Sequence, residues 1–242
     1  VCAEGTVLVA APETHSVHAL DAVDGTQRWT FRAGGRVDSP PTISAGLAIF
    51  GCADGSVYAV RLTDAELVWR FLAAPHDRRT VSYDQVESVW PVTGSVLVQD
   101  EVVYCTAGRS SYLDGGMRLY RLDLATGEEL SRKQLYHRDP ETGRQPEEIM
   151  EDVELPGFLP DVLHTDGQSL FLRDNRMDML GNTLESNVPH MYSSVGFLDD
   201  SWWHRTYWIF GVHTYGRASG WAVAGNHLPS GRICVLDDST MF

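Results

Sequence analysis

The densest group of chemically versatile side chains in this 242-residue sequence lies between positions 199 and 205. Two carboxylates, two indoles, an imidazole and a guanidinium occur together there: Asp199, Asp200, Trp202, Trp203, His204 and Arg205. Such a set could line a ligand pocket, or it could lock neighbouring strands through hydrogen bonds and packed rings. In a strand, Trp202 and His204 would share one face and Trp203 and Arg205 the other. Because both faces of a packed blade are buried, a structural role is favoured over a pocket.

Metal and redox chemistry have no recognisable motif in the sequence. The four cysteines, Cys2, Cys52, Cys105 and Cys234, form neither a CxxC pair nor a CxxCH haem site, and the nine histidines show no HxH or HExxH spacing. Buried free thiols are therefore expected rather than disulfides. The stretch Asp174–Asp178 lacks the glycine and the terminal glutamate of an EF-hand, so a turn explains it better than a calcium loop. No catalytic, cofactor-binding or metal-ligating residue is assigned.

The elements that must position any such group repeat along the chain. The stretch Val17–Phe31 recurs forty residues later as Val57–Phe71, and a weaker third copy spans Leu119–Leu130. In each copy an apolar strand leads through a tight turn into a second strand. That second strand carries Trp29 in the first copy and Trp69 in the second, and the third copy has lost this aromatic residue.

A further strand pair precedes each unit. Three hairpins align by their turns, at Pro41–Phe50, Val96–Tyr104 and Asp161–Leu172. About four strands per repeat is the content of one propeller blade. We therefore predict an all-β β-propeller of four-stranded antiparallel blades, with about five blades or part-blades visible and the ring incomplete. A helical array with a similar period is disfavoured because helical periodicity is absent.

The segment Ala19–Trp29 resembles the tryptophan-docking motif of the PQQ-like (pyrroloquinoline quinone repeat) β-propeller family. The resemblance implies that the motif's tryptophan packs on the neighbouring blade while the turn residues hydrogen-bond around it. Trp29 and Trp69 would form this structural girdle, and Asp21 and Gly25 match the turn residues in the first copy.

The rest of the chain matches the family less evenly. The second turn departs from the motif at Arg61 and Ala65. Towards the C-terminus, Gly196–Arg205 and Gly231–Asp238 resemble a narrower branch of large bacterial PQQ-like repeat proteins, which has no agreed biochemical activity. The resemblance therefore implies a fold more than a function.

Three functional classes follow from the resemblance. The preferred one is a non-catalytic propeller that acts as a protein-interaction scaffold at the bacterial cell envelope, periplasmic or secreted, with a protein partner. The alternatives are a PQQ- and calcium-dependent dehydrogenase and a carbohydrate- or protein-binding sensor domain. The scaffold is preferred because the sequence supplies blades and girdle residues but no catalytic set; PQQ and calcium enter by resemblance only. The adjacent cysteine pair that is common over the quinone in alcohol-oxidising members is absent.

The charge composition of the sequence limits the classes of partner that the protein can bind. With 19 Lys and Arg against 33 Asp and Glu, the net charge is −14, so a nucleic-acid partner is not expected. The acidic run Pro146–Glu154 reads as a solvated loop within a surface insertion at about 136–156. No apolar run is long enough to span a bilayer. One domain over 1–242 is expected, and both ends read as cuts through strands, so missing blades of the same protein would complete the ring.

Overall fold

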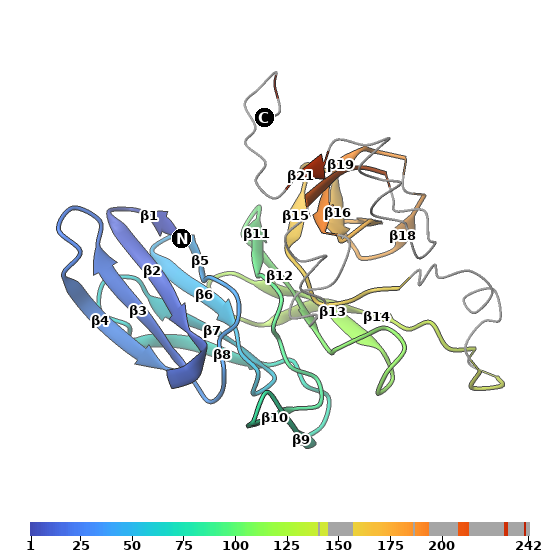
Figure 1. Cartoon of the computed structure of the whole chain (residues 1–242), viewed down its shortest axis with the longest axis horizontal. Coiled ribbons are helices and arrows are strands. Elements are labelled where there is room, and N and C mark those ends of the chain that lie inside the picture. Colours follow the sequence, from blue (N-terminus) through green and yellow to red (C-terminus); the bar gives the residue numbers. More distant parts are fainter. Residues whose placement is uncertain are drawn as a thin grey trace.

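The computed structural model describes residues 1–139, 141–144, 157–185, 187–193, 208–212, 230–231 and 240. Within these ranges the only helix is the short 3-10 element η1 (Pro12–Thr14), and the other elements are strands. In Figure 1 the blades follow one another along an open arc, from blue at the N-terminus to red. The all-β propeller expectation is therefore confirmed.

The strands group into blades in chain order. Blade 1 consists of β1 (Cys2–Ala3), β2 (Thr6–Ala11), β3 (Ser16–Asp21) and β4 (Gln27–Arg32). Blade 2 consists of β5 (Thr42–Ser44), β6 (Leu47–Gly51), β7 (Ser56–Arg61) and β8 (Leu67–Leu72). Blade 3 consists of β11 (Leu97–Gln99), β12 (Val102–Ala107), β13 (Met117–Asp123) and β14 (Glu129–Leu135). Blade 4 consists of β15 (Leu163–Thr165), β16 (Ser169–Leu172), β17 (Asn175–Asp178) and β18 (Thr183–Leu184). Blade 5 has β19 (His190–Ser193), β20 (Trp208–Gly211) and β21 (Ser230–Gly231).

Every blade is an antiparallel meander. The first four sheets have four strands each in sequential order, and the fifth has three. The predicted hairpins at Pro41–Phe50, Val96–Tyr104 and Asp161–Leu172 correspond to the pairs β5–β6, β11–β12 and β15–β16. The described chain therefore contains four complete blades and part of a fifth, as the repeat predicts.

Strand β7 shows why its sequence is continuously apolar and does not alternate between apolar and polar residues. Its side chains Tyr58 and Val60 pack in a cluster shared with blade 1, whereas Val57 and Ala59 pack in a cluster shared with blade 3. All four are buried. Because successive strand residues point to opposite faces, a strand between two blades needs apolar residues at every position.

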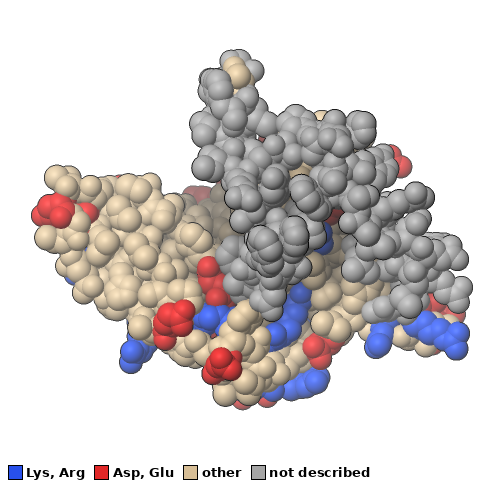
Figure 2. Space-filling view, viewed as in Figure 1, with Lys and Arg blue, Asp and Glu red and all other residues tan. Residues whose placement is uncertain are grey.

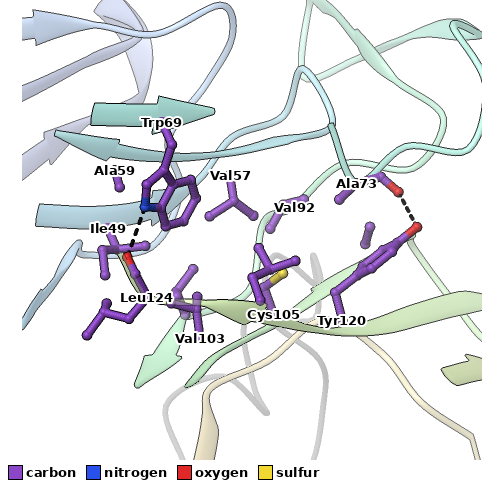
Figure 3. Close-up of a cluster of buried hydrophobic side chains, with 13 residues drawn as sticks. Ile49, Val57, Ala59, Trp69, Ala73, Val92, Val103, Cys105, Tyr120 and Leu124 are labelled. Atoms are coloured by element: carbon purple, nitrogen blue, oxygen red, sulfur yellow. Dashed lines mark hydrogen bonds between the residues drawn. The ribbon is translucent and has the colours of Figure 1, made fainter. Parts of the chain in front are cut away.

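The hydrophobic core is thus divided into layers between blades. One cluster joins blades 1 and 2, a second joins blades 2 and 3, and a third joins blades 3 and 4. Figure 3 shows the second of these, in which Ile49, Val57, Ala59 and Trp69 of blade 2 face Val103, Cys105, Tyr120 and Leu124 of blade 3. Each blade is therefore stabilised mainly by its neighbours, as in other repeat architectures.

One strand pair lies outside the blade pattern. The hairpin of β9 (Arg79–Ser82) and β10 (Gln85–Ser88) forms its own two-stranded sheet in the connection between blades 2 and 3. Its turn residues Tyr83 and Asp84 both have positive φ, 52° and 58°. The sequence analysis did not predict this hairpin, because a Tyr-Asp turn carries no glycine or asparagine signal.

The predicted insertion at about 136–156 is described only over 136–139 and 141–144. That part contains a turn in which the backbone N–H of Gly143 donates to the oxygen of Asp139. The acidic run Pro146–Glu154 lies outside the described residues. Among the residues that the structure describes, no helix is long and apolar enough to cross a bilayer.

Candidate functional site

Trp29 links blade 1 to blade 2. It lies on β4 and is buried, and its indole Nε1 donates a hydrogen bond of 2.7 Å to the backbone oxygen of Leu62. Leu62 directly follows β7 in the turn of the next blade. The ring packs in the same cluster as Val60 and Leu62.

Trp69 makes the equivalent contact one blade further on. It is buried on β8, and its Nε1 donates a hydrogen bond of 2.9 Å to the backbone oxygen of Leu124, which follows β13 of blade 3 (Figure 3). A second hydrogen bond joins blades 2 and 3: the Tyr120 hydroxyl donates to the backbone oxygen of Ala73, which follows β8. A buried indole that satisfies its donor on the next blade both fills space and sets the register between blades.

The turn residues Asp21 and Gly25 lie in blade 1, on the side away from blade 2. Asp21 Oδ1 accepts hydrogen bonds from the backbone N–H groups of Val23 and Asp24, and Gly25 N–H donates to the oxygen of Asp21. Gly25 has a φ of +74° and open space where a Cβ would lie. Hydrogen bonding to Arg28, together with the backbone donors, holds the pKa of Asp21 below its usual range.

The second turn keeps this backbone without its usual residues. Ala65 N–H donates to the oxygen of Arg61, as Gly25 does to Asp21, and Ala65 adopts a φ of +63°. In place of the aspartate, the Arg61 guanidinium pairs with Asp64 and Glu66 at 2.8 Å each. These pairs are solvent-exposed, so the turn is held mainly by its backbone bonds and by packing of Leu62 and Ala65 in the cluster shared with blade 1.

In the third turn, Gly127 lies directly against the Trp69 ring. A Cβ added to Gly127 would come within 2.5 Å of the Trp69 Cδ2 atom, and the glycine has a φ of +71°. A glycine is therefore required here for two separate reasons: its backbone has a positive φ, and the indole leaves no space for a Cβ atom.

Substituting Gly127 with Ala should therefore cost more than the same change at Gly25. Both alanines carry a left-handed backbone penalty of about 1–2 kcal/mol, but only Gly127→Ala adds overlap with an indole, of about 1–3 kcal/mol. Urea unfolding of both variants measures the difference. In a Trp69→Ala background the two penalties should become equal, and a difference that survives there would contradict the contact.

Among the described residues, no tryptophan lies in the contact between blades 3 and 4. Ser131 stands at the place of Trp29 and Trp69 and accepts a hydrogen bond from Arg121. Two residues on, the Lys133 stem lies 3.1 Å from the Cβ position of Gly181, and its ammonium donates to Asn182 at 3.0 Å. An aliphatic stem and one exposed hydrogen bond replace the buried indole at this seam.

The loops beside blades 2 and 3 hold a buried ionic cluster that the sequence analysis did not identify. The Arg36 guanidinium lies 2.5 Å from Asp38 Oδ1 and 2.9 Å from Glu87 Oε2, and Glu87 also binds Arg109 through its other oxygen. The ring of Tyr83 lies 4.6 Å from the Arg36 guanidinium carbon. Burial raises the pKa of Asp38 although Arg36 pulls it down. The cluster joins three connections that are far apart in sequence.

An open groove of about 610 Å³ separates the outer strands of blades 2 and 3. Phe71 and Leu72 contribute apolar surface from β8, and Arg118, Tyr120 and Arg132 contribute from β13 and β14. Figure 2 shows that basic side chains gather towards the lower centre and lower right of the view, beside acidic ones.

The predicted pocket candidates Asp199, Asp200, Trp202, Trp203, His204 and Arg205 lie outside the described residues. Their pocket or structural role stays a prediction.

Cysteine and metal chemistry gain no support in the described part of the chain. Cys2 is exposed and free, Cys52 and Cys105 are buried and free, and Cys234 lies outside the described residues. Burial raises the pKa of both buried thiols, that of Cys105 to about 12, so neither is a reactive thiolate at neutral pH.

No group of three or more His, Cys, Asp or Glu side chains that could hold a metal ion occurs among the described residues.

Comparison with solved structures places the chain in a class. Quinohemoprotein alcohol dehydrogenase from Comamonas testosteroni is 18% identical with a TM-score of 0.54, covering 73% of this chain and 28% of that one. Quinohemoprotein alcohol dehydrogenase ADHIIG from Pseudomonas putida HK5 is 17% identical with a TM-score of 0.55, covering 91% of this chain and 33% of that one. At this identity the likeness shows the fold alone, and the chain spans a third or less of those proteins. The class that this likeness defines is the β-propeller fold.

The family follows from the sequence match. The family model PQQ_2, described as outer membrane protein assembly factor BamB, matches residues 1–153. The chain therefore belongs to this PQQ-like repeat family, as the tryptophan motif indicates. No curated protein matches the chain.

Proposed function

We propose that this chain is part of a non-catalytic β-propeller that acts as a protein-interaction scaffold at the bacterial cell envelope. Support for the location comes from the family, whose description is an outer membrane protein assembly factor. Support for the role comes from one observation, the groove between the outer strands of blades 2 and 3.

The groove has the surface chemistry of a protein interface. Phe71 lines the groove from β8, and its ring contacts Tyr120 edge to face at 5.1 Å between centroids. Aromatic and arginine side chains around exposed apolar surface are the composition that protein interfaces enrich. At about 610 Å³ the groove has room for several partner side chains.

Arg118 gives the groove a directional polar contact. Its guanidinium carbon lies 5.8 Å from the Trp90 ring centroid, and its buried Nη1 has no hydrogen-bond partner among the described residues. Arg118 lines the groove, and a guanidinium pairs well with a carboxylate of another chain. The partner segment we propose therefore places an apolar side chain on Phe71 and an acidic group at Arg118.

A photo-crosslinking residue in place of Gln134, which lines the groove from β14, should form a discrete adduct in the intact protein in its native host. Arg118→Ala should weaken that adduct about tenfold or more, since it removes the donor for the partner's carboxylate. The matched control is the same crosslinker in place of Val23, which is 95% exposed on blade 1. Equal adducts from both positions would overturn the groove as an interface. Retention of quinone absorbance by purified protein supplied with PQQ and calcium would instead favour the dehydrogenase.

A further inference from the structure

The contact between blades 4 and 5 is built differently from the three before it. Among the described residues, each earlier pair of neighbouring blades shares a buried hydrophobic cluster, whereas Tyr192 and Ile209 of blade 5 form a cluster of their own. Aromatic rings meet across this contact: the centroid of His190 on β19 lies 4.4 Å from that of Phe171 on β16 and 5.6 Å from that of His164 on β15. His190 of blade 5 is thus packed against two rings of blade 4.

Both ring nitrogens of His190 face a backbone carbonyl. Nε2 lies 2.8 Å from the oxygen of Arg173, in the β16–β17 turn of blade 4, and Nδ1 lies 3.0 Å from the oxygen of Val188, just before β19. A carbonyl oxygen can only accept, and a neutral imidazole carries one N–H and one lone pair. The neutral ring would therefore hold a lone pair against one of the two oxygens, whereas the imidazolium donates to both.

The rings around His190 also favour a positive charge. Phe171 at 4.4 Å and Tyr192 at 5.4 Å lie within the distance at which aromatic rings attract cations. The third ring, His164, is kept neutral because burial lowers its pKa, and a positive charge on His190 lowers that pKa further. The hydrogen-bond geometry and the aromatic surroundings therefore agree on the imidazolium form of His190.

Several charged groups surround this contact, and one of them titrates in the mildly acidic range. Asp161 precedes β15, and Arg173 and Asp174 form the β16–β17 turn, whereas β20, which pairs with β19, carries no titratable side chain. Burial raises the pKa of Asp161 to about 6, with Arg173 lowering it and Asp174 raising it. Because this value lies above the usual 3.8, deprotonation of Asp161 reduces stability as the pH rises from about 4 through 6. The effect of Asp161 must therefore be separated from that of His190 by substitution.

We propose that His190 is a proton-dependent latch between blades 4 and 5. The imidazolium donates to the carbonyls of Arg173 and Val188 and holds β19 against blade 4, whereas loss of its proton leaves one oxygen facing a lone pair. Histidine is the side chain that changes its charge between pH 5 and 8. Because the docked blade binds the proton more tightly than the undocked one, blade 5 docks more firmly as the pH falls through this range. The latch is independent of the groove between blades 2 and 3.

Hydrogen exchange of the full chain, read by mass spectrometry on peptides from β19 and β20, tests the latch at about pH 5.5 and about pH 8.5. The Asp161→Asn variant serves as the background because its carboxylate no longer titrates. Protection relative to the unfolded chain should there be about tenfold higher at the lower pH, since a hydrogen bond from a charged donor is gained. Adding His190→Gln, which keeps an amide donor but takes up no proton, should remove the difference. Adding His18→Gln, on β3 of blade 1, is the matched control and should retain it.

A second measurement examines the parent protein. Nitrogen NMR of histidine-labelled protein reports which ring nitrogens carry protons, and the His190 signals are those missing from His190→Gln. At about pH 7, where an exposed histidine is mostly neutral, we expect both nitrogens of His190 to be mostly protonated. A neutral His190 at this pH, or a difference in protection that persists in the variant carrying His190→Gln, would overturn the latch.

Discussion

Replacing Trp69 with Ala is expected to lower the free energy of unfolding by about 3–5 kcal/mol. The indole is only 7% exposed and fills the layer between blades 2 and 3, and its loss also leaves the oxygen of Leu124 without its donor. Urea unfolding monitored by circular dichroism measures the change. Trp69→Phe keeps much of the buried ring but removes the donor, so it should cost about 1–3 kcal/mol.

Leu67→Ala, on the same strand but about half exposed, is the control for Trp69→Ala. It should cost well under the Trp69 value, since most of its side chain is already in water. If Trp69→Ala lost no more stability than Leu67→Ala, the docking contact would have no energetic role.

Glu87→Ala is the second substitution with a large expected effect, again about 3–5 kcal/mol. Glu87 forms ion pairs with both Arg36 and Arg109, and its side chain is only 2% exposed. Removing it leaves the buried Arg36 guanidinium with Asp38 as its remaining anionic partner. Thermal unfolding at several salt concentrations measures the loss, which should vary little with salt because buried pairs are screened weakly.

Glu66→Ala is the matched control for the ionic cluster. Glu66 also pairs with an arginine, Arg61, but both side chains are about half exposed or more. Its loss should change stability by less than about 1 kcal/mol and should be salt-sensitive. If Glu87→Ala lost as little stability as Glu66→Ala, with the same dependence on salt, the ionic cluster would be accessible to solvent and not buried.

The blades could be predicted from the sequence because their signals are local. Each hairpin has its turn within the segment that forms it, and the forty-residue repeat shows which segments are equivalent. The positions of Trp29 and Trp69 follow from the same repeat. Their partners do not, because the carbonyls of Leu62 and Leu124 carry no side-chain signature.

Features that depend on distant contacts could not be predicted. Arg36, Glu87 and Arg109 belong to three separate connections, and no spacing in the sequence joins them. The positive φ of Ala65 is likewise invisible, since alanine rarely adopts it without the support of a neighbouring blade. His164 and His190 belong to different blades, and their rings meet only once blade 5 packs on blade 4.

The tryptophan contacts can form only after the following blade has been synthesised. Each indole belongs to the last strand of its blade, and its acceptor lies 33 residues later for Trp29 and 55 later for Trp69. At translation rates of about 5–20 residues per second, each indole has no acceptor for roughly 2–11 s after it is made. During these intervals the growing end of a nascent chain exposes Trp29 and then Trp69 without the next-blade carbonyl that each indole binds in the folded protein.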